Sequence, residues 1–84
     1  MSRMKEEVKT LEATGSAGAG MVEVSVNGEY QVLSVKIDPE IVSKDDVSTL
    51  ETLMLSAFND ASKKIKDRIE SYTKEKVLSG GWRN

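Results

Sequence analysis

Eight apolar residues, spaced three or four positions apart, run through the C-terminal half of this 84-residue sequence. Their intervals of 3, 4, 4, 3, 4, 4 and 3 form an eleven-residue repeat, which is typical of one face of a straight helix. Such a seam is roughly 38 Å long at about 1.5 Å per residue. We predict this helix over residues 43–78, with a capping box at Ser43 and Asp46 and a stop at Gly80 and Gly81. The seam consists of Val47, Leu50, Met54, Phe58, Ala61, Ile65, Ile69 and Tyr72.

The two halves of this helix differ in how much of their surface is apolar. Leu53, Leu55 and Ala57 broaden the seam of the first half, so a sheet and a partner are expected to cover it. From Ser62 onward only the narrow seam remains, and the charged segment 63–76 is expected to project as an arm. A core of this size supplies about 3 to 5 kcal/mol and no Cys is present to add a disulfide, so we expect a homodimer. Its predicted interface is Leu50, Leu53, Met54, Phe58, Ala61 and Ile65.

Residues 12–39 predict a three-stranded antiparallel sheet. Ala13–Gly20 is too rich in glycine for a helix and fits a short strand followed by a loop. Met21–Asn27 alternates apolar and polar residues, as a half-buried strand does. Asn27 and Gly28 then predict a two-residue type I′ turn into Tyr30–Ile37, and the Asp38-Pro39 pair ends that strand.

The returning strand contains a change of phase. Tyr30 and Val32 are even-numbered, whereas Leu33, Val35 and Ile37 are odd-numbered. A bulge near Val32, a loop longer than two residues, or burial on both faces would each account for it. The pattern leaves these three explanations open.

The N-terminus predicts one further helix, because Met1, Met4, Val8 and Leu11 recur at helical spacing. The expected fold is therefore α+β in a single domain, residues 1–84. It comprises a short helix in 1–11, an antiparallel sheet with a β-hairpin in 12–39, a long helix in 43–78 and a tail in 79–84.

The composition argues against an enzyme. The sequence has no His and no Cys, so the commonest general base, the commonest metal ligand and the cysteine nucleophile are all missing. No metal, cofactor or small-molecule substrate is expected. No apolar run reaches the roughly 18 residues of a membrane span, and residues 1–11 lack the apolar centre of a secretory signal. We expect a soluble, cytoplasmic protein.

Charge is distributed unevenly along the chain. The net charge of −2 divides into +1 for residues 1–11, −7 for residues 12–60 and +4 for residues 61–84. An acidic body with basic ends is typical of a chain that meets a polyanionic partner.

An ordered set of short motifs resembles the YbaB/EbfC family of bacterial nucleoid-associated proteins. The motifs are Thr14-Gly15, Gly18-Ala19-Gly20, MVEVSVNG at 21–28, VKIDP at 35–39 and AFNDA at 57–61. The resemblance implies a helix, a three-stranded antiparallel sheet and a long helix, assembled as a homodimer whose projecting helices grip duplex DNA like tweezers. It also implies a nucleoid location and an influence on nucleoid organisation and gene expression. The first helix is shorter here than is usual in that family.

The basic ends supply the predicted DNA contacts. Because they are mostly lysines without interleaved base-reading side chains, we expect phosphate contacts with low sequence selectivity. The competing interpretation is a solvated helix with four i,i+4 ion pairs: Asp60–Lys64, Lys63–Asp67, Lys66–Glu70 and Glu70–Lys74. That pattern leaves Arg68 over, with Lys64 on the same edge of the seam. The predicted DNA-binding residues are Lys63, Lys64, Lys66, Arg68, Lys74, Arg3, Lys5 and Lys9.

The alternative function is a dimeric protein scaffold that does not bind DNA. Tyr72 is interpreted as packing on the seam or at the dimer interface, and a base-stacking role for Trp82 is disfavoured. Asn59 is expected to cap loop backbone at the dimer interface. The glycine loop at 15–20 precedes a strand and so does not match a dinucleotide-binding loop. Turn and cap chemistry explains the acidic residues Asp38, Glu40, Asp45 and Asp46 better than a cation site does.

Overall fold

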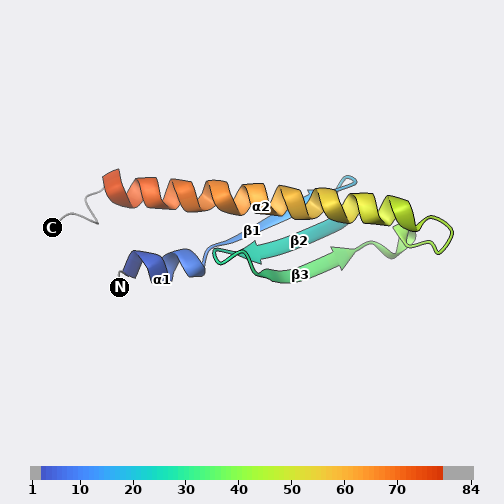
Figure 1. Cartoon of the computed structure of the whole chain (residues 1–84), viewed down its shortest axis with the longest axis horizontal. Helices are drawn as coiled ribbons and strands as arrows, with labels where there is room; N and C mark the ends of the chain where they lie inside the picture. Colours follow the sequence, from blue (N-terminus) through green and yellow to red (C-terminus); the bar gives the residue numbers. More distant parts are fainter. Residues whose placement is uncertain (1–2, 79–84) are drawn as a thin grey trace.

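The computed structural model describes residues 3–78 and contains two helices packed with a three-stranded sheet (Figure 1). Residues 1–2 and 79–84, which include Met1, the Gly80-Gly81 stop and Trp82, lie outside the described residues. The molecule is elongated, measuring 60 × 18 × 14 Å. In chain order the elements are α1 (Arg3–Lys9), β1 (Glu12–Ala17), β2 (Val22–Asn27), β3 (Val32–Ile37), the short 3₁₀ turn η1 (Pro39–Ile41) and α2 (Val47–Leu78).

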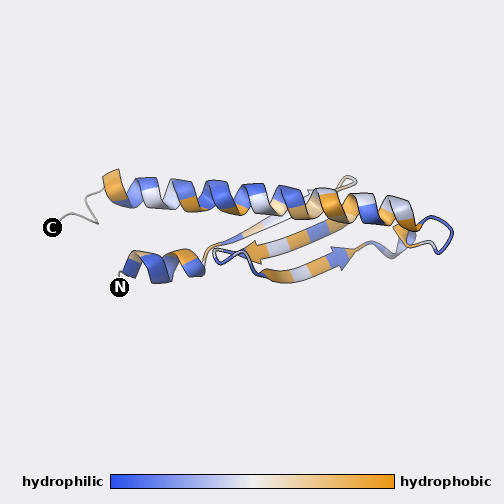
Figure 2. Ribbon diagram, in the orientation of Figure 1, coloured by the Kyte–Doolittle hydropathy of each residue, from blue (hydrophilic) through white to orange (hydrophobic). Residues whose placement is uncertain are grey.

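The sheet is antiparallel in the order β1-β2-β3, and α2 lies across one of its faces (Figure 1). The predicted alternation of β2 is confirmed, since Val22, Val24 and Val26 are buried and their neighbours are not. These valines pack against three residues of α2, namely Ala57, Ala61 and Ile65, to form the core. Figure 2 shows the same pattern as alternating hydropathy along β2 and β3, and a mainly hydrophilic C-terminal half of α2.

Gly15 lies where α2 crosses β1, and it allows the strand and the helix to approach closely. A Cβ atom placed on Gly15 would lie 2.6 Å from Ala61 Cα and 2.7 Å from the carbonyl oxygen of Ala57. Both distances are too short for a carbon atom, so only glycine fits. Two of the motifs that carry the family resemblance, Thr14-Gly15 and residues 57–61, thus meet at one contact.

The β2–β3 hairpin differs from the predicted type I′ turn. The turn runs from Asn27 to Tyr30, closed by the Tyr30 N–H donating to the Asn27 carbonyl at 2.9 Å. Asn27 Oδ1 accepts the N–H groups of Glu29 and Gln31 at 2.9 and 3.0 Å. The positive φ, +63°, belongs to Tyr30 and not to Asn27 or Gly28. Because Asn27 uses its side chain as a cap, it takes the first position of a longer loop.

The change of phase in β3 comes from this longer loop together with a bulge. Val26 pairs with Val32 while Ser25 pairs with Ser34, so Leu33 is the extra residue. Gly28 has a packing role, because a Cβ atom there would lie 2.7 Å from the carbonyl carbon of Val8. The hairpin therefore rests directly on the last turn of α1.

The long helix begins at Val47, four residues after the predicted start. Asp46 is its N-cap, with Oδ1 accepting the N–H of Thr49 at 3.2 Å and Oδ2 accepting its hydroxyl. These bonds from Thr49 lower the pKa of Asp46 below its ordinary value. Ser43 instead accepts the N–H of Asp45, which makes residues 43–46 a turn. Asp38 likewise accepts the N–H of Glu40 at the start of η1, so the cap and turn interpretation of Asp38 and Asp46 is confirmed.

Across the part of the chain that the structure describes, no helix is both long and apolar enough to cross a membrane. The same residues contain no group of three or more His, Cys, Asp or Glu side chains placed to hold a metal ion.

Candidate nucleic-acid interface

The bases predicted to contact DNA do not share one face of α2. Ile65 is fully buried against the sheet, and at about 100° per residue Lys64 and Arg68 lie about 100° and 60° to one side of it. Lys66 lies about 100° to the other side, while Lys63 and Lys74 lie on the back of the helix, about 160° and 180° away. The helix therefore brings Lys64 and Arg68 together on one side of Ile65, and Lys63 and Lys66 together on the other.

Lys64 is held beside the sheet by Asp60. Its Nζ lies 2.9 Å from Asp60 Oδ2, and the same oxygen accepts the backbone N–H of Ser16 on β1 at 2.9 Å. The Ser16 N–H, followed by Lys64, lowers the pKa of Asp60 below its ordinary value. Asp60 thus bonds strand backbone within the chain. Asn59 is exposed in the single chain, and its expected role at a dimer interface stays a prediction.

Two of the four expected ion pairs form. Lys63–Asp67 is 3.5 Å long and Lys64–Asp60 is 2.9 Å long. Among residues 3–78, the ion pairs include neither Lys66–Glu70 nor Glu70–Lys74. The solvated-helix interpretation therefore accounts for only part of the basic arm.

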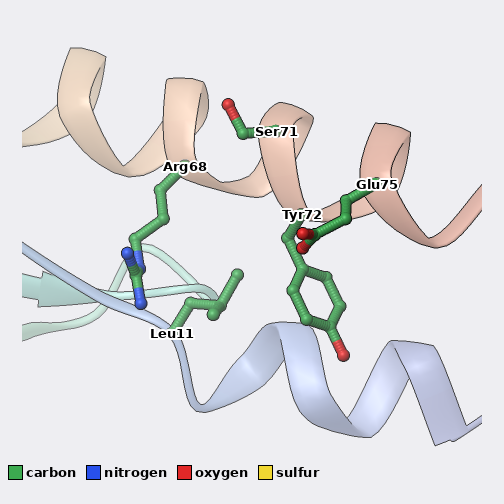
Figure 3. Close-up of a pocket in the computed structure, with 5 residues that line it drawn as sticks. All are labelled: Leu11, Arg68, Ser71, Tyr72 and Glu75. Carbon is green, nitrogen blue, oxygen red and sulfur yellow. The ribbon is translucent and has the colours of Figure 1, made fainter.

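Arg68 lines an open groove of about 330 Å³ between α2 and the start of β1. Figure 3 shows Arg68 and Tyr72 extending from α2 toward the N-terminal segment, with Leu11 between them and Ser71 turned away. Glu75 completes the lining. Within the described residues, the guanidinium of Arg68 makes no ion pair or hydrogen bond. The sequence pattern likewise gave Arg68 no i,i+4 partner of opposite charge.

The clasp is our name for three residues, Glu7, Tyr72 and Lys76, that join α1 to α2. The Tyr72 hydroxyl donates to Glu7 Oε1, and Lys76 Nζ lies 3.8 Å from the same oxygen. Lys76 Nζ also lies 5.5 Å from the centre of the Tyr72 ring, within cation–π range. Sequence reasoning missed the clasp, because Glu7 and Tyr72 are 65 positions apart and nothing in the pattern couples them.

The clasp also fixes which way the bases of α1 point. At about 100° per residue, Lys5 and Lys9 lie about 160° from Glu7, on the side of α1 away from α2. Lys9 pairs with Glu6 at 3.5 Å on the exposed surface. Arg3 is exposed on the first turn.

Two of the six residues of the predicted dimer interface are buried within the chain itself. Ala61 and Ile65 are fully buried in the chain's own core and have no surface to offer a partner. The other four predicted residues, Leu50, Leu53, Met54 and Phe58, are partly buried against that core. The large exposed apolar side chains instead include Val32, Leu33 and Val35 on β3, which are 47%, 48% and 40% exposed.

Comparisons with known proteins agree with this fold. Residues 1–81 match the YbaB/EbfC DNA-binding family. Nucleoid-associated protein mlr5504 of Mesorhizobium japonicum is 41% identical over 71 residues, covering 84% of this chain and 66% of the relative. The chain thus spans just under two thirds of that relative's length.

A solved structure shares the architecture. The crystal structure of uncharacterized protein HP0035 from Helicobacter pylori superposes with a TM-score of 0.69 at 27% identity, covering 84% of this chain and 82% of that one. This match confirms the expected fold class of short helix, three-stranded antiparallel sheet and long helix. The chain belongs to the YbaB/EbfC DNA-binding family.

Proposed function

We propose that this chain binds duplex DNA with low sequence selectivity, as a homodimer, through phosphate contacts from its basic helical segments. In a bacterial cytoplasm such binding would contribute to nucleoid organisation and gene expression. The observation that carries the proposal is the pair Lys64 and Arg68, within a chain of a DNA-binding family. The two residues lie on the same side of α2, where Lys64 pairs with Asp60 and Arg68 makes no ion pair among residues 3–78.

The chemistry of this pair favours phosphate over bases. A guanidinium presents a planar fork of donors that matches two phosphate oxygens, and an ammonium acts as a point charge. The arm's aromatic residue within the described chain, Tyr72, is engaged in the clasp and is not presented for stacking. Contacts of this kind position a protein on the duplex without reading its sequence.

DNA binding by the arms also requires that the negative charge of residues 12–60 does not repel the DNA. Residues 61–84 carry +4 per chain and +8 per dimer, against −7 and −14 for residues 12–60. The second half of α2 extends beyond the sheet (Figure 1). Since the Debye length is about 8 Å at physiological salt, bases near the end of α2 are screened from the acidic body.

The uncovered strand β3 supports the proposed homodimer. α2 packs on β1 and β2, and the exposed side chains of Val32 and Val35 lie on the same face of the sheet as the buried valines with which they pair. A second copy of this chain is the occupant that the family resemblance implies. We therefore move the proposed interface from Ala61 and Ile65 to the β3 side of the sheet.

A salt titration of DNA binding tests the proposal. With about four to six phosphates neutralised, log affinity should fall against log salt with a slope of about −4 to −5. Replacing Lys64 and Arg68 together by Ala should reduce the magnitude of that slope by about 2 and weaken binding to unrelated duplexes alike. Fluorescence anisotropy with two labelled duplexes of different sequence measures both quantities.

A matched control separates position from charge. The double variant Lys36→Ala/Lys44→Ala removes the same charge from β3 and the loop before α2, and should keep the parent slope. If Lys64→Ala/Arg68→Ala binds as tightly as the parent and with the same slope, the arm does not hold DNA. The scaffold function, in which the arms dock a protein, would then be favoured.

A further inference from the structure

We propose that Glu7 is a positioning residue for DNA binding. Through the clasp it fixes α1 along α2, so that the two basic segments act as one rigid arm. This inference rests on the proposed function and adds a role for an acidic residue that would be expected to repel DNA.

The first step concerns the stability of α1. The helix has seven residues, Arg3–Lys9, and isolated helices shorter than about 12 to 15 residues are marginal in water. None of its residues is fully buried. Its conformation therefore depends on contacts with the rest of the chain.

Those contacts come from two sides. On one side, the carbonyl of Val8 packs on Gly28 so closely that no Cβ atom fits between them. On the other, Glu7 accepts the Tyr72 hydroxyl and lies 3.8 Å from Lys76. Thr10 closes the helix by donating its hydroxyl to the Glu7 carbonyl at 2.7 Å. The hairpin sets where α1 ends, and the clasp sets how α1 lies along α2.

The second step concerns electrostatics. The Glu7 and Lys76 side chains are 39% and 40% exposed, so the clasp is open to salt and competing ions. A carboxylate beside a DNA-binding arm lowers affinity through its charge alone. If charge were its only effect, replacing Glu7 should tighten DNA binding. If Glu7 positions α1, replacing it should weaken binding, because Lys5 and Lys9 lose their fixed direction.

Alanine variants of two neighbouring glutamates test whether the loss of Glu7 weakens or tightens DNA binding. Glu7→Ala and Glu6→Ala remove the same charge from the same helix, but Glu6 pairs only with Lys9 on the surface. We expect Glu7→Ala to bind a labelled duplex about tenfold more weakly than Glu6→Ala, with the magnitude of the salt slope lower by about 2 to 3. Tyr72→Phe removes one bond of the clasp without changing charge and should shift affinity in the same direction.

A double-mutant cycle separates positioning from general destabilisation. In a background with Arg3, Lys5 and Lys9 replaced by Gln, Glu7→Ala should change DNA affinity only as much as Glu6→Ala does. With the bases that Glu7 positions gone, only the loss of one negative charge remains. If Glu7→Ala weakens DNA binding in that background as much as it does in the parent, the proposal is overturned. Equal DNA affinity of Glu7→Ala and Glu6→Ala in the parent would also overturn it.

Hydrogen exchange of α1 amides, measured without DNA, keeps the two proposals distinguishable. Exchange should be faster in Glu7→Ala than in Glu6→Ala, and equal rates would overturn the clasp whatever the DNA result. A parent protein that shows no salt-dependent DNA binding would overturn the proposed function and, with it, the role of Glu7.

Discussion

The two edges of the sheet are built differently, although β1 and β3 flank the same central strand. β1 has a glycine and two alanines, Ala13, Gly15 and Ala17, and α2 lies directly on it. β3 has larger apolar residues, including Val32, Leu33 and Val35, which neither α1 nor α2 covers. Because the side chains of β1 are small, α2 can pack closely on this strand. The small residues therefore determine which part of the sheet α2 covers. The larger residues at the other edge stay exposed in the single chain.

One backbone N–H at the β1 edge of the sheet is already hydrogen-bonded to α2. Among the described residues, no side chain of α2 makes such a bond to β3. Asp60 on α2 accepts the Ser16 N–H of β1, which satisfies an amide at an edge of the sheet. If two chains assemble as proposed, stability of the single chain and assembly of the dimer depend on opposite edges. Substitutions at the two edges should therefore affect different measurements.

The largest effect should follow from filling the space at Gly15. Gly15→Val places side-chain atoms against the backbone of Ala61, which must move away, and should lower the free energy of unfolding by about 3 kcal/mol or more. Thermal unfolding followed by circular dichroism measures the loss. Thr14→Val, on the opposite face of the same strand, is the control and should change little. Equal melting temperatures for the two variants would contradict the close packing of β1 on α2.

The next effect concerns the β3 edge. Val35→Asp should leave the fold of the chain intact, since Val35 is 40% exposed, but should weaken self-association by about 2 to 3 kcal/mol. The dimer dissociation constant would then rise by about 30- to 150-fold. Light scattering coupled to size exclusion measures the mass as a function of concentration. Ser34→Asp adds the same charge at the neighbouring position, and if it dissociates the dimer equally, the interface does not lie on this face.

A smaller effect should come from the bond that closes the β1 edge, and it should depend on pH. The Ser16 N–H and Lys64 lower the pKa of Asp60, so the folded state favours its ionised form. The stability this provides is fully present above the unfolded pKa of about 3.9 and is lost as pH falls through the lower folded pKa. Asp60→Asn should therefore have a lower melting temperature than the parent at pH 7. The difference between the two melting temperatures should shrink toward pH 3.

A control on the same helix sharpens this test. Asp67 pairs with Lys63 of the same helix at 3.5 Å on the exposed surface. Asp67→Asn should show a smaller melting-temperature difference from the parent at pH 7 than Asp60→Asn does. If the melting-temperature difference between Asp60→Asn and the parent does not change with pH, the charge of the Asp60 carboxylate does not stabilise the contact with β1.

The smallest effect is a gain at the loop that joins β1 to β2. Ala19 has a φ of +56°, in the left-handed region where an alanine side chain is disfavoured and asparagine is enriched. Ala19→Asn should raise the free energy of unfolding by about 0.5 kcal/mol without altering dimer mass. Chemical denaturation measures the gain. A loss of stability would indicate that the Ala19 methyl group makes a favourable contact.

Patterns that are local in sequence predicted the fold well. Alternation over Met21–Asn27 and three- or four-residue spacing along α2 each reflect the geometry of one element, so strand β2 and the long helix were expected. The change of phase in β3 also signalled its bulge. The choice of Asp46 over Ser43 as the N-cap was missed, because both residues can cap a helix and only the path of the preceding turn decides between them.

Features that depend on how elements pack were not predictable in the same way. The burial of Ala61 and Ile65, as opposed to an interface role, follows from where α2 lies across the sheet. The role of Gly28 follows from its contact with Val8 on another element. In the candidate site, the isolation of Arg68 was visible from its helical neighbours, whereas the partner of Tyr72 lies 65 positions away in sequence.

The bond between Ser16 and Asp60 has a consequence for how the chain is made. It joins residues 44 positions apart, whereas each strand pairs with the strand next to it in sequence. Synthesis from the N-terminus completes all three strands before α2 exists, so Val22 and Val24 stay open to solvent until Ile65 has left the ribosome. A nascent chain therefore presents an uncovered apolar face on both halves of its sheet. Docking of α2 closes one half, and the other half stays open in the single chain.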